Sequence, residues 1–151
     1  MRDVELSGEG RRVVVVVLDQ GDEAVAAVNE VARRRGILAA QVTAVGGFST
    51  AEVGYFDWRI RDYQRIPVPE QVEVLALTGD IAEFRGEPAL HVHAVLGRRD
   101  GSTVGGHLLR AEVWPTLEVI VTEVAASLAK RVDPETGLAL LSGAARSRTG
   151  R

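Results

Sequence analysis

Three histidines are the residues of this 151-residue chain whose types and spacing could do chemistry. His91 and His93 alternate within the run Leu90 to Leu96, whose apolar and β-branched residues predict a strand. Successive side chains of a strand point to opposite faces, so both imidazoles project from the same face. The chain has no cysteine, so a tight metal site must use histidine nitrogen and carboxylate oxygen. The pair therefore predicts two ligands of a divalent metal ion.

His107 joins this pair if the chain turns back at residues 99–101. Glycine as the third residue of a three-residue hairpin loop supplies the left-handed conformation that such a loop requires. The resulting register places His93 directly opposite His107, with His91 as its diagonal neighbour on the same face. All three imidazoles then converge, and His91, His93 and His107 are the predicted metal ligands.

A different turn gives a different outcome for His107. A two-residue loop at Asp100-Gly101 shifts the register by one residue and moves His107 to the opposite face. A bulge at Gly105-Gly106 could restore either arrangement, and these glycines could also let a neighbouring backbone approach the site. Three imidazoles suit Zn²⁺ with a fourth position open to water or a small-molecule ligand, and nickel, copper and iron accept the same ligands.

The elements that must position this hairpin begin with a central strand and a helix. The continuous apolar run Val13 to Leu18 predicts a strand that is buried on both faces. A helix over residues 22–35 follows, with Asp22 as its cap and Gly36 as its stop. Its stripe of alanines and valines at three- and four-residue spacing predicts packing on a sheet.

The rest of the chain has almost entirely strand character. The predicted strands cover residues 40–48, 51–57, 60–66, 72–81, 89–97, 103–113 and 117–124. Their short connections require mainly antiparallel pairing, because a parallel crossover needs a dozen residues or more and only the helix supplies one. We therefore expect one α+β domain over residues 1–141, a mostly antiparallel sheet with one main helix packed on it. Residues 125–141 are ambiguous, and residues 142–151 predict a polar, disordered tail.

Composition restricts the function classes further. The formal net charge of −3 gives few phosphate contacts, so weak and strongly salt-dependent DNA binding is the most that we expect. No window approaches the ~20 apolar residues that span a bilayer, and the N-terminal residues lack the layout of a signal peptide. The expectation is a cytoplasmic protein with no membrane segment.

The chain resembles the plant-and-prokaryote-conserved (PPC) domain family, found in plant AT-hook proteins and in stand-alone prokaryotic proteins. The matching segments, in sequence order, are residues 43–48, 54–57, 86–97, 100–101, 105–108 and 115–119. The resemblance implies an antiparallel sheet with one main helix, a homotrimer, and a metal held by His91, His93 and His107. Plant members add an AT-hook with a Gly-Arg-Pro core, and the tail of this chain lacks the proline. They also carry a partner-binding Gly-Arg-Phe-Glu-Ile element, where this chain has residues 70–74 with a different sequence.

Two functions fit these observations. The first is a non-enzymatic, metal-stabilised homotrimer that acts as a DNA-associated or regulatory module and binds DNA or a protein weakly. The second is a metal-dependent decarboxylase or hydrolase acting on a small molecule, because three histidines with an open position also describe catalytic zinc and are similar to acetolactate decarboxylase. Glu112 and Glu118 are the nearest acidic residues in sequence that could transfer a proton. We favour the first function.

A physical reason for assembly comes from two strands, residues 72–77 and 117–121, that carry apolar residues on both faces. One helix cannot cover both faces, so the second must be covered by another layer of the chain or by neighbouring subunits. A ring of three subunits would provide that cover with closed symmetry, and it would place the metal sites near subunit boundaries.

Overall fold

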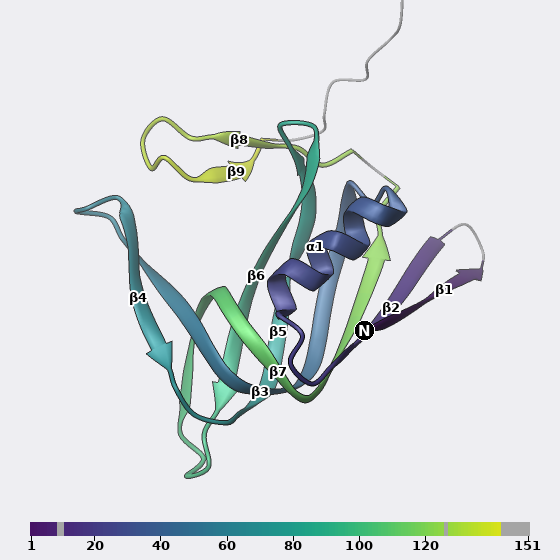
Figure 1. Ribbon diagram of the computed structural model, residues 1–151. Helices are drawn as coiled ribbons and strands as arrows, with labels where there is room; N and C mark the ends of the chain where they lie inside the picture. The colour runs from purple at the N-terminus through teal and green to yellow at the C-terminus, as the bar shows by residue number, and fades with distance from the viewer. Residues whose placement is uncertain (9–10, 126, 143–151) are drawn as a thin grey trace, which may run out of the picture.

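The computed structural model describes residues 1–8, 11–125 and 127–142. Within these ranges the chain forms nine strands and one helix (Figure 1). In chain order they are β1 (Arg2–Gly8), β2 (Arg11–Asp19), α1 (Ala24–Arg35), β3 (Ala39–Asp57), β4 (Asp62–Val68), β5 (Val72–Phe84), β6 (Glu87–Gly97), β7 (Thr103–Glu123), β8 (Lys130–Val132) and β9 (Ala139–Leu141). No helix in the described part of the chain has the length and apolar character needed to span a bilayer.

Seven strands form one sheet in the order β1-β2-β7-β6-β5-β3-β4, and every pairing of neighbours is antiparallel. Because β7 also pairs with β3, the four strands β3, β5, β6 and β7 close into a ring. Strands β2 and β3 both run antiparallel to β7, and α1 supplies the crossover between them. The predicted α+β class, a mostly antiparallel sheet with one helix, is confirmed.

The ends of α1 show one correct and one wrong prediction. Gly36 ends the helix in the left-handed conformation at φ 64°, as predicted. The N-cap is Glu23, not Asp22: its carboxylate accepts hydrogen bonds from the backbone N–H groups of Val25 and Ala26. The Asp22 carboxylate instead accepts a hydrogen bond from the backbone at the end of β2. Sequence rules assign the cap to Asp22, but this side chain stabilises the turn after β2 instead.

Two pairs of predicted strands are each one long, bent strand. The segments 40–48 and 51–57 are both in β3, and the segments 103–113 and 117–124 are both largely in β7. The bends pack against each other: a Cβ at Gly46 would lie 2.9 Å from the Cα of Leu117. The pairing of β3 changes register on both sides of Gly46, so this glycine lies at a bulge. The glycine allows β3 to bend there and continue as one strand where the sequence pattern indicates a break.

Strands at the two ends of the chain were not predicted. The N-terminal residues form the edge strand β1, which pairs with β2. The ambiguous segment 125–141 contains a small hairpin, β8 and β9. From residue 143 onward, the tail expected over residues 142–151 lies outside the described residues.

The helix α1 lies against one face of the sheet (Figure 1), and the buried hydrophobic residues cluster there. Val28 and Val31 of the helix are buried there, together with alternate residues of the long strands. The opposite face of the sheet, which we call the outer face, carries exposed apolar residues. Those on β1, β3, β6 and β7 are Val4, Leu6, Val45, Val95 and Ile120.

Candidate metal centre

The β6–β7 hairpin has the register that the three-residue loop predicts. The N–H of Arg98 donates to the carbonyl of Ser102 at 2.8 Å, and Gly101 has φ 83°. His93 lies directly opposite His107. Residues Val92 and Ala94, between and beside the β6 histidines, are buried toward the helix, so the histidines project from the outer face.

All three predicted ligand residues come together. The ring centroids are 5.2 Å apart for His91 and His93, 5.1 Å for His91 and His107, and 5.4 Å for His93 and His107. One nitrogen from each ring can be chosen so that the three atoms lie within 4.8 Å of one another. His91 and His107 are partly buried, and His93 is exposed. The cluster thus offers a compact set of imidazole nitrogens that is open to solvent on one side.

Glycines beside His107 allow the neighbouring strands to approach closely. A Cβ at Gly106 would lie 2.6 Å from the carbonyl oxygen of Gly54, which faces His107 on β3. A Cβ at Gly54 would lie 2.7 Å from the Tyr63 ring. Because both positions lack a side chain, Tyr63 of β4 stacks on His107 with centroids 4.8 Å apart and planes at 24°. The predicted close approach of a neighbouring backbone to the site is confirmed.

The surroundings of His91 and His107 favour the neutral forms of these two imidazoles. Burial, followed by the smaller effects of the neighbouring His91 and His93, lowers the pKa of His107 to about 4. Burial also lowers the pKa of His91, and the nearby Lys130 ammonium adds to that effect. The neutral ring presents a nitrogen lone pair to a metal. Within the described residues, no group hydrogen-bonds to the buried Nδ1 of His107, which leaves that nitrogen free to act as a ligand.

The carboxylate next to the cluster is Asp80, which sequence reasoning missed. Its Oδ2 lies 3.6 Å from Nδ1 of His91, and its Oδ1 lies 2.8 Å from the Nζ of Lys130. The Lys130 contact is an ion pair by distance, although its angles leave Oδ1 without a hydrogen bond. Glu112 and Glu118, the nearest acidic residues in sequence, pair with β3 elsewhere on the sheet. Asp80 could have been found from a predicted β5–β6 register, because it lies opposite His91.

A comparison with protein families matches residues 5–125 to the Plants and Prokaryotes Conserved (PCC) domain. The chain belongs to the PCC domain family. This is the family, also written PPC, that the sequence motifs indicated. A comparison with curated proteins finds no match.

Several solved structures are similar to this PCC domain. The metal-containing protein AF0104 from Archaeoglobus fulgidus is 31% identical with a TM-score of 0.81, covering 93% of this chain and 98% of its own. A candidate DNA-binding protein from Bacteroides thetaiotaomicron is 25% identical with a TM-score of 0.84, covering 93% of this chain and 97% of its own. A more distant Staphylococcus aureus protein, similar to alpha-acetolactate decarboxylase, is 17% identical with a TM-score of 0.55. It covers 74% of this chain and 52% of its own, and at that identity it shares the fold alone.

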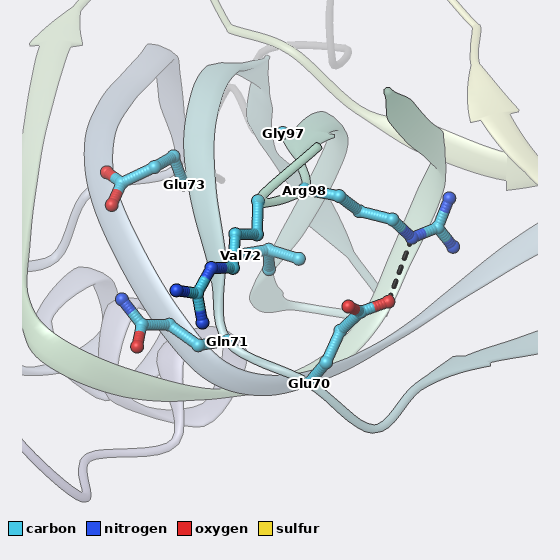
Figure 2. A pocket seen from close by; sticks show the side chains of 7 residues that line it. Glu70, Gln71, Val72, Glu73, Gly97 and Arg98 are labelled. Atoms are coloured by element: carbon cyan, nitrogen blue, oxygen red, sulfur yellow. Dashed lines mark hydrogen bonds and ion pairs between the residues drawn. The ribbon is translucent and has the colours of Figure 1, made fainter. Parts of the chain in front are cut away.

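A second hollow in this PCC domain lies away from the histidines, where the chain enters β5 and leaves β6. This pocket of about 500 Å³ is lined by Glu70, Gln71, Val72, Glu73, Gly97, Arg98 and Arg99. Figure 2 shows Arg98 turned toward Glu70, and the two side chains form an ion pair at 2.9 Å. The pocket is lined by charged groups of both signs, so its lining favours neither an anion nor a cation.

Proposed function

We propose that this PCC domain is a homotrimeric, metal-binding module that holds one divalent ion per chain, zinc, through His91, His93 and His107. The observation that carries the proposal is the convergence of the chain's only three histidines on one hairpin face. Its role is that of a regulatory module rather than an enzyme. The metal-containing relative AF0104 adds support from outside the chain.

The donor set fits zinc. Tetrahedral zinc with bonds of ~2.0–2.1 Å places its nitrogen ligands ~3.3 Å apart. The imidazole nitrogens lie within 4.8 Å of one another, so small side-chain rotations would suffice to bring them to that spacing. Three neutral imidazoles leave one coordination position for water or a small ligand. Zinc is favoured over magnesium and calcium because those ions take oxygen ligands.

The metal assignment is tested by elemental analysis of purified protein. Wild type is expected to carry about one zinc per chain, and His93→Ala to carry much less because His93 adjoins both other rings. Thr43→Ala is the matched control, since Thr43 is exposed on the same face but two strands from His93, with Thr78 of β5 between them. Equal metal content in wild type and His93→Ala would refute the site.

Support for the trimer comes from the outer face. Val4 is 57% exposed, Val45 56% and Ile120 46%. They lie on one face of β1, β3 and β7, and Val15 of β2 connects Val4 to Ile120 across the sheet. Scattered apolar residues are normal on a protein surface, but a contiguous patch indicates an interaction site. The histidines project from this same face, so subunits packed through it would bring a neighbour close to the metal. Closed symmetry would cover the patch in every subunit.

Light scattering at micromolar concentration tests the assembly. Three copies of the 16.2 kDa chain give a mass of about 49 kDa. Ile120→Asp should dissociate the assembly, because a charge would have to be buried without a partner. Leu140→Asp is the control: Leu140 is also exposed, but lies on β9 outside the main sheet. A wild-type mass of about 16 kDa would reject the trimer.

A metal-dependent decarboxylase or hydrolase is the alternative, and the exposure of His93 beside a nearby carboxylate favours it. One oxygen of Asp80 is already held in an ion pair with Lys130, however, which counts against a catalytic role for this carboxylate. The direct assay incubates zinc-loaded protein with acetolactate and measures released carbon dioxide. Metal-dependent release that is lost in His93→Ala would establish the enzyme and overturn the regulatory role.

A further inference from the structure

Lys130 is a buried charge that the proposed metal site does not by itself explain. Its side chain is 4% exposed, and lysine is rarely buried to this degree without a partner. Lys130 lies on β8, beyond residues 5–125 that match the family model. A segment outside the matched region therefore brings a positive charge into the protein next to the histidines.

The backbone holds this segment in place against β5. The N–H of Glu83 donates to the carbonyl of Leu128 at 2.9 Å, and Glu83 forms a parallel bridge with Ala129. The N–H of Ser142 also donates to the carbonyl of Ala129 at 2.9 Å. Lys130 follows directly, so these hydrogen bonds hold the backbone from which its side chain extends.

Lys130 contacts the two strands that support His91. Its Nζ lies 2.8 Å from Oδ1 of Asp80 and donates to the carbonyl of Ala89 at 3.2 Å. Asp80 is paired across the sheet with His91, and Ala89 precedes His91 by two residues on β6. The lysine thus ties β5 to β6 at the point where the first histidine projects.

We infer that Lys130 and Asp80 are positioning residues for His91, a role that rests on the proposed metal site. Asp80 Oδ2 lies 3.6 Å from Nδ1 of His91, a few tenths of an ångström beyond hydrogen-bond length. A carboxylate there stabilises the neutral tautomer with its proton on Nδ1, because the N–H dipole then points at negative charge. That tautomer leaves the Nε2 lone pair for the metal. Lys130 holds the Asp80 carboxylate in position through their ion pair.

The test compares charge-removing variants with a matched control. Lys130→Met removes the ammonium group, and Asp80→Leu with Lys130→Met removes both charges, so that no unpaired charge stays buried. Lys130→Arg preserves the charge. Arg131→Met is the control, because it changes the net charge equally at the adjacent, exposed position. The readouts are zinc affinity by competition with a chromophoric chelator, the visible spectrum of the cobalt-substituted protein, and the His91 tautomer from ¹⁵N NMR of metal-free protein.

The double variant is expected to bind zinc ~10–100-fold more weakly than wild type, the usual effect of removing a partner of a metal-binding histidine. Its cobalt spectrum should change, and His91 should lose its preference for the Nδ1–H tautomer. Lys130→Met should shift all three readouts in the same direction, whereas Lys130→Arg and Arg131→Met should resemble wild type. Zinc affinity within twofold of wild type and an unchanged tautomer in Lys130→Met and the double variant would overturn the inference. If the wild type binds no zinc, the proposed metal site is refuted. The tautomer of His91 in metal-free protein would still decide whether Asp80 and Lys130 position this histidine.

Discussion

Gly79→Ala should destabilise the protein strongly, because Gly79 lies where β5 and β6 approach each other behind the metal site. A Cβ at this position would overlap the carbonyl oxygen of His91 and lie 2.8 Å from both the carbonyl carbon of His91 and the Cα of Val92. Ordinary contacts of a Cβ begin at about 3.4 Å. The two strands would therefore have to separate by at least about 0.6 Å at the carbon contacts.

The loss of folding free energy in Gly79→Ala has two parts. Overpacking a well-packed interior costs ~1–3 kcal/mol, and backbone atoms relax less readily than side chains. Each weakened hydrogen bond of the β5–β6 ladder adds ~0.5–1.5 kcal/mol. With one or two bonds affected, the free energy of unfolding should fall by ~2–5 kcal/mol, a large share of the ~5–15 kcal/mol that is usual for a domain.

Guanidinium unfolding of metal-free protein at one fixed protein concentration measures this cost. Gly101→Ala is the control, because Gly101 has φ 83° and an added Cβ would meet nothing within 4 Å. It should cost only the ~1–2 kcal/mol of a left-handed alanine. Gly79→Ala should also bind zinc more weakly, since the backbone of His91 is displaced, whereas Gly101→Ala should not. If Gly79→Ala proves no less stable than Gly101→Ala, the close approach of β5 and β6 is wrong.

Three further outcomes are expected. Phe48→Ala should lower the free energy of unfolding by ~3–5 kcal/mol, because Phe48 is fully buried, and calorimetry measures this loss. The zinc affinity of the folded protein should stay unchanged, as a zinc titration would show. Metal-free protein should lose stability as the pH falls from about 6.5 to about 4, because the unfolded chain binds a proton at His107 in that window and the folded chain does not. Denaturant titrations at several pH values should show this decrease in the free energy of unfolding. An equally steep decrease in His107→Gln would contradict the assignment to His107. Fluorescence anisotropy should detect weak DNA binding at most, decreasing steeply with salt, and nanomolar sequence-selective binding at physiological salt would refute this expectation.

The sequence was sufficient to predict the ligand hairpin, because the features that determine it are local. Gly101 selects the loop, the loop sets the register, and the register places His93 opposite His107. The end of the helix at Gly36 follows from an equally local rule. The edge strand β1 escaped prediction because its first residues are mainly charged, with only Val4 and Leu6 as apolar members.

Features that depend on distant partners could not be predicted. Gly46 and Trp114-Pro115 each look like a strand break along the chain, yet the two bends are held against each other by pairing between β3 and β7. Asp80 and Lys130 meet beside His91 from segments 50 residues apart. Neither residue has a local pattern that indicates a role at the site, since an aspartate in a strand and a lysine in a loop-like segment are common at the surface.

The long strand β7 also constrains how the chain can fold as it leaves the ribosome. It pairs with β2, β3 and β6, so strands at the beginning of the chain depend on a partner that is synthesised near the end. Until residues 116–122 emerge, β2 has only β1 to pair with, and its apolar residues have no sheet to join. Such long-range pairing slows folding and delays it until most contacts are available. The domain must therefore fold after the ribosome has made nearly all of it, and nascent chains that stop before β7 are candidates for chaperone binding and degradation.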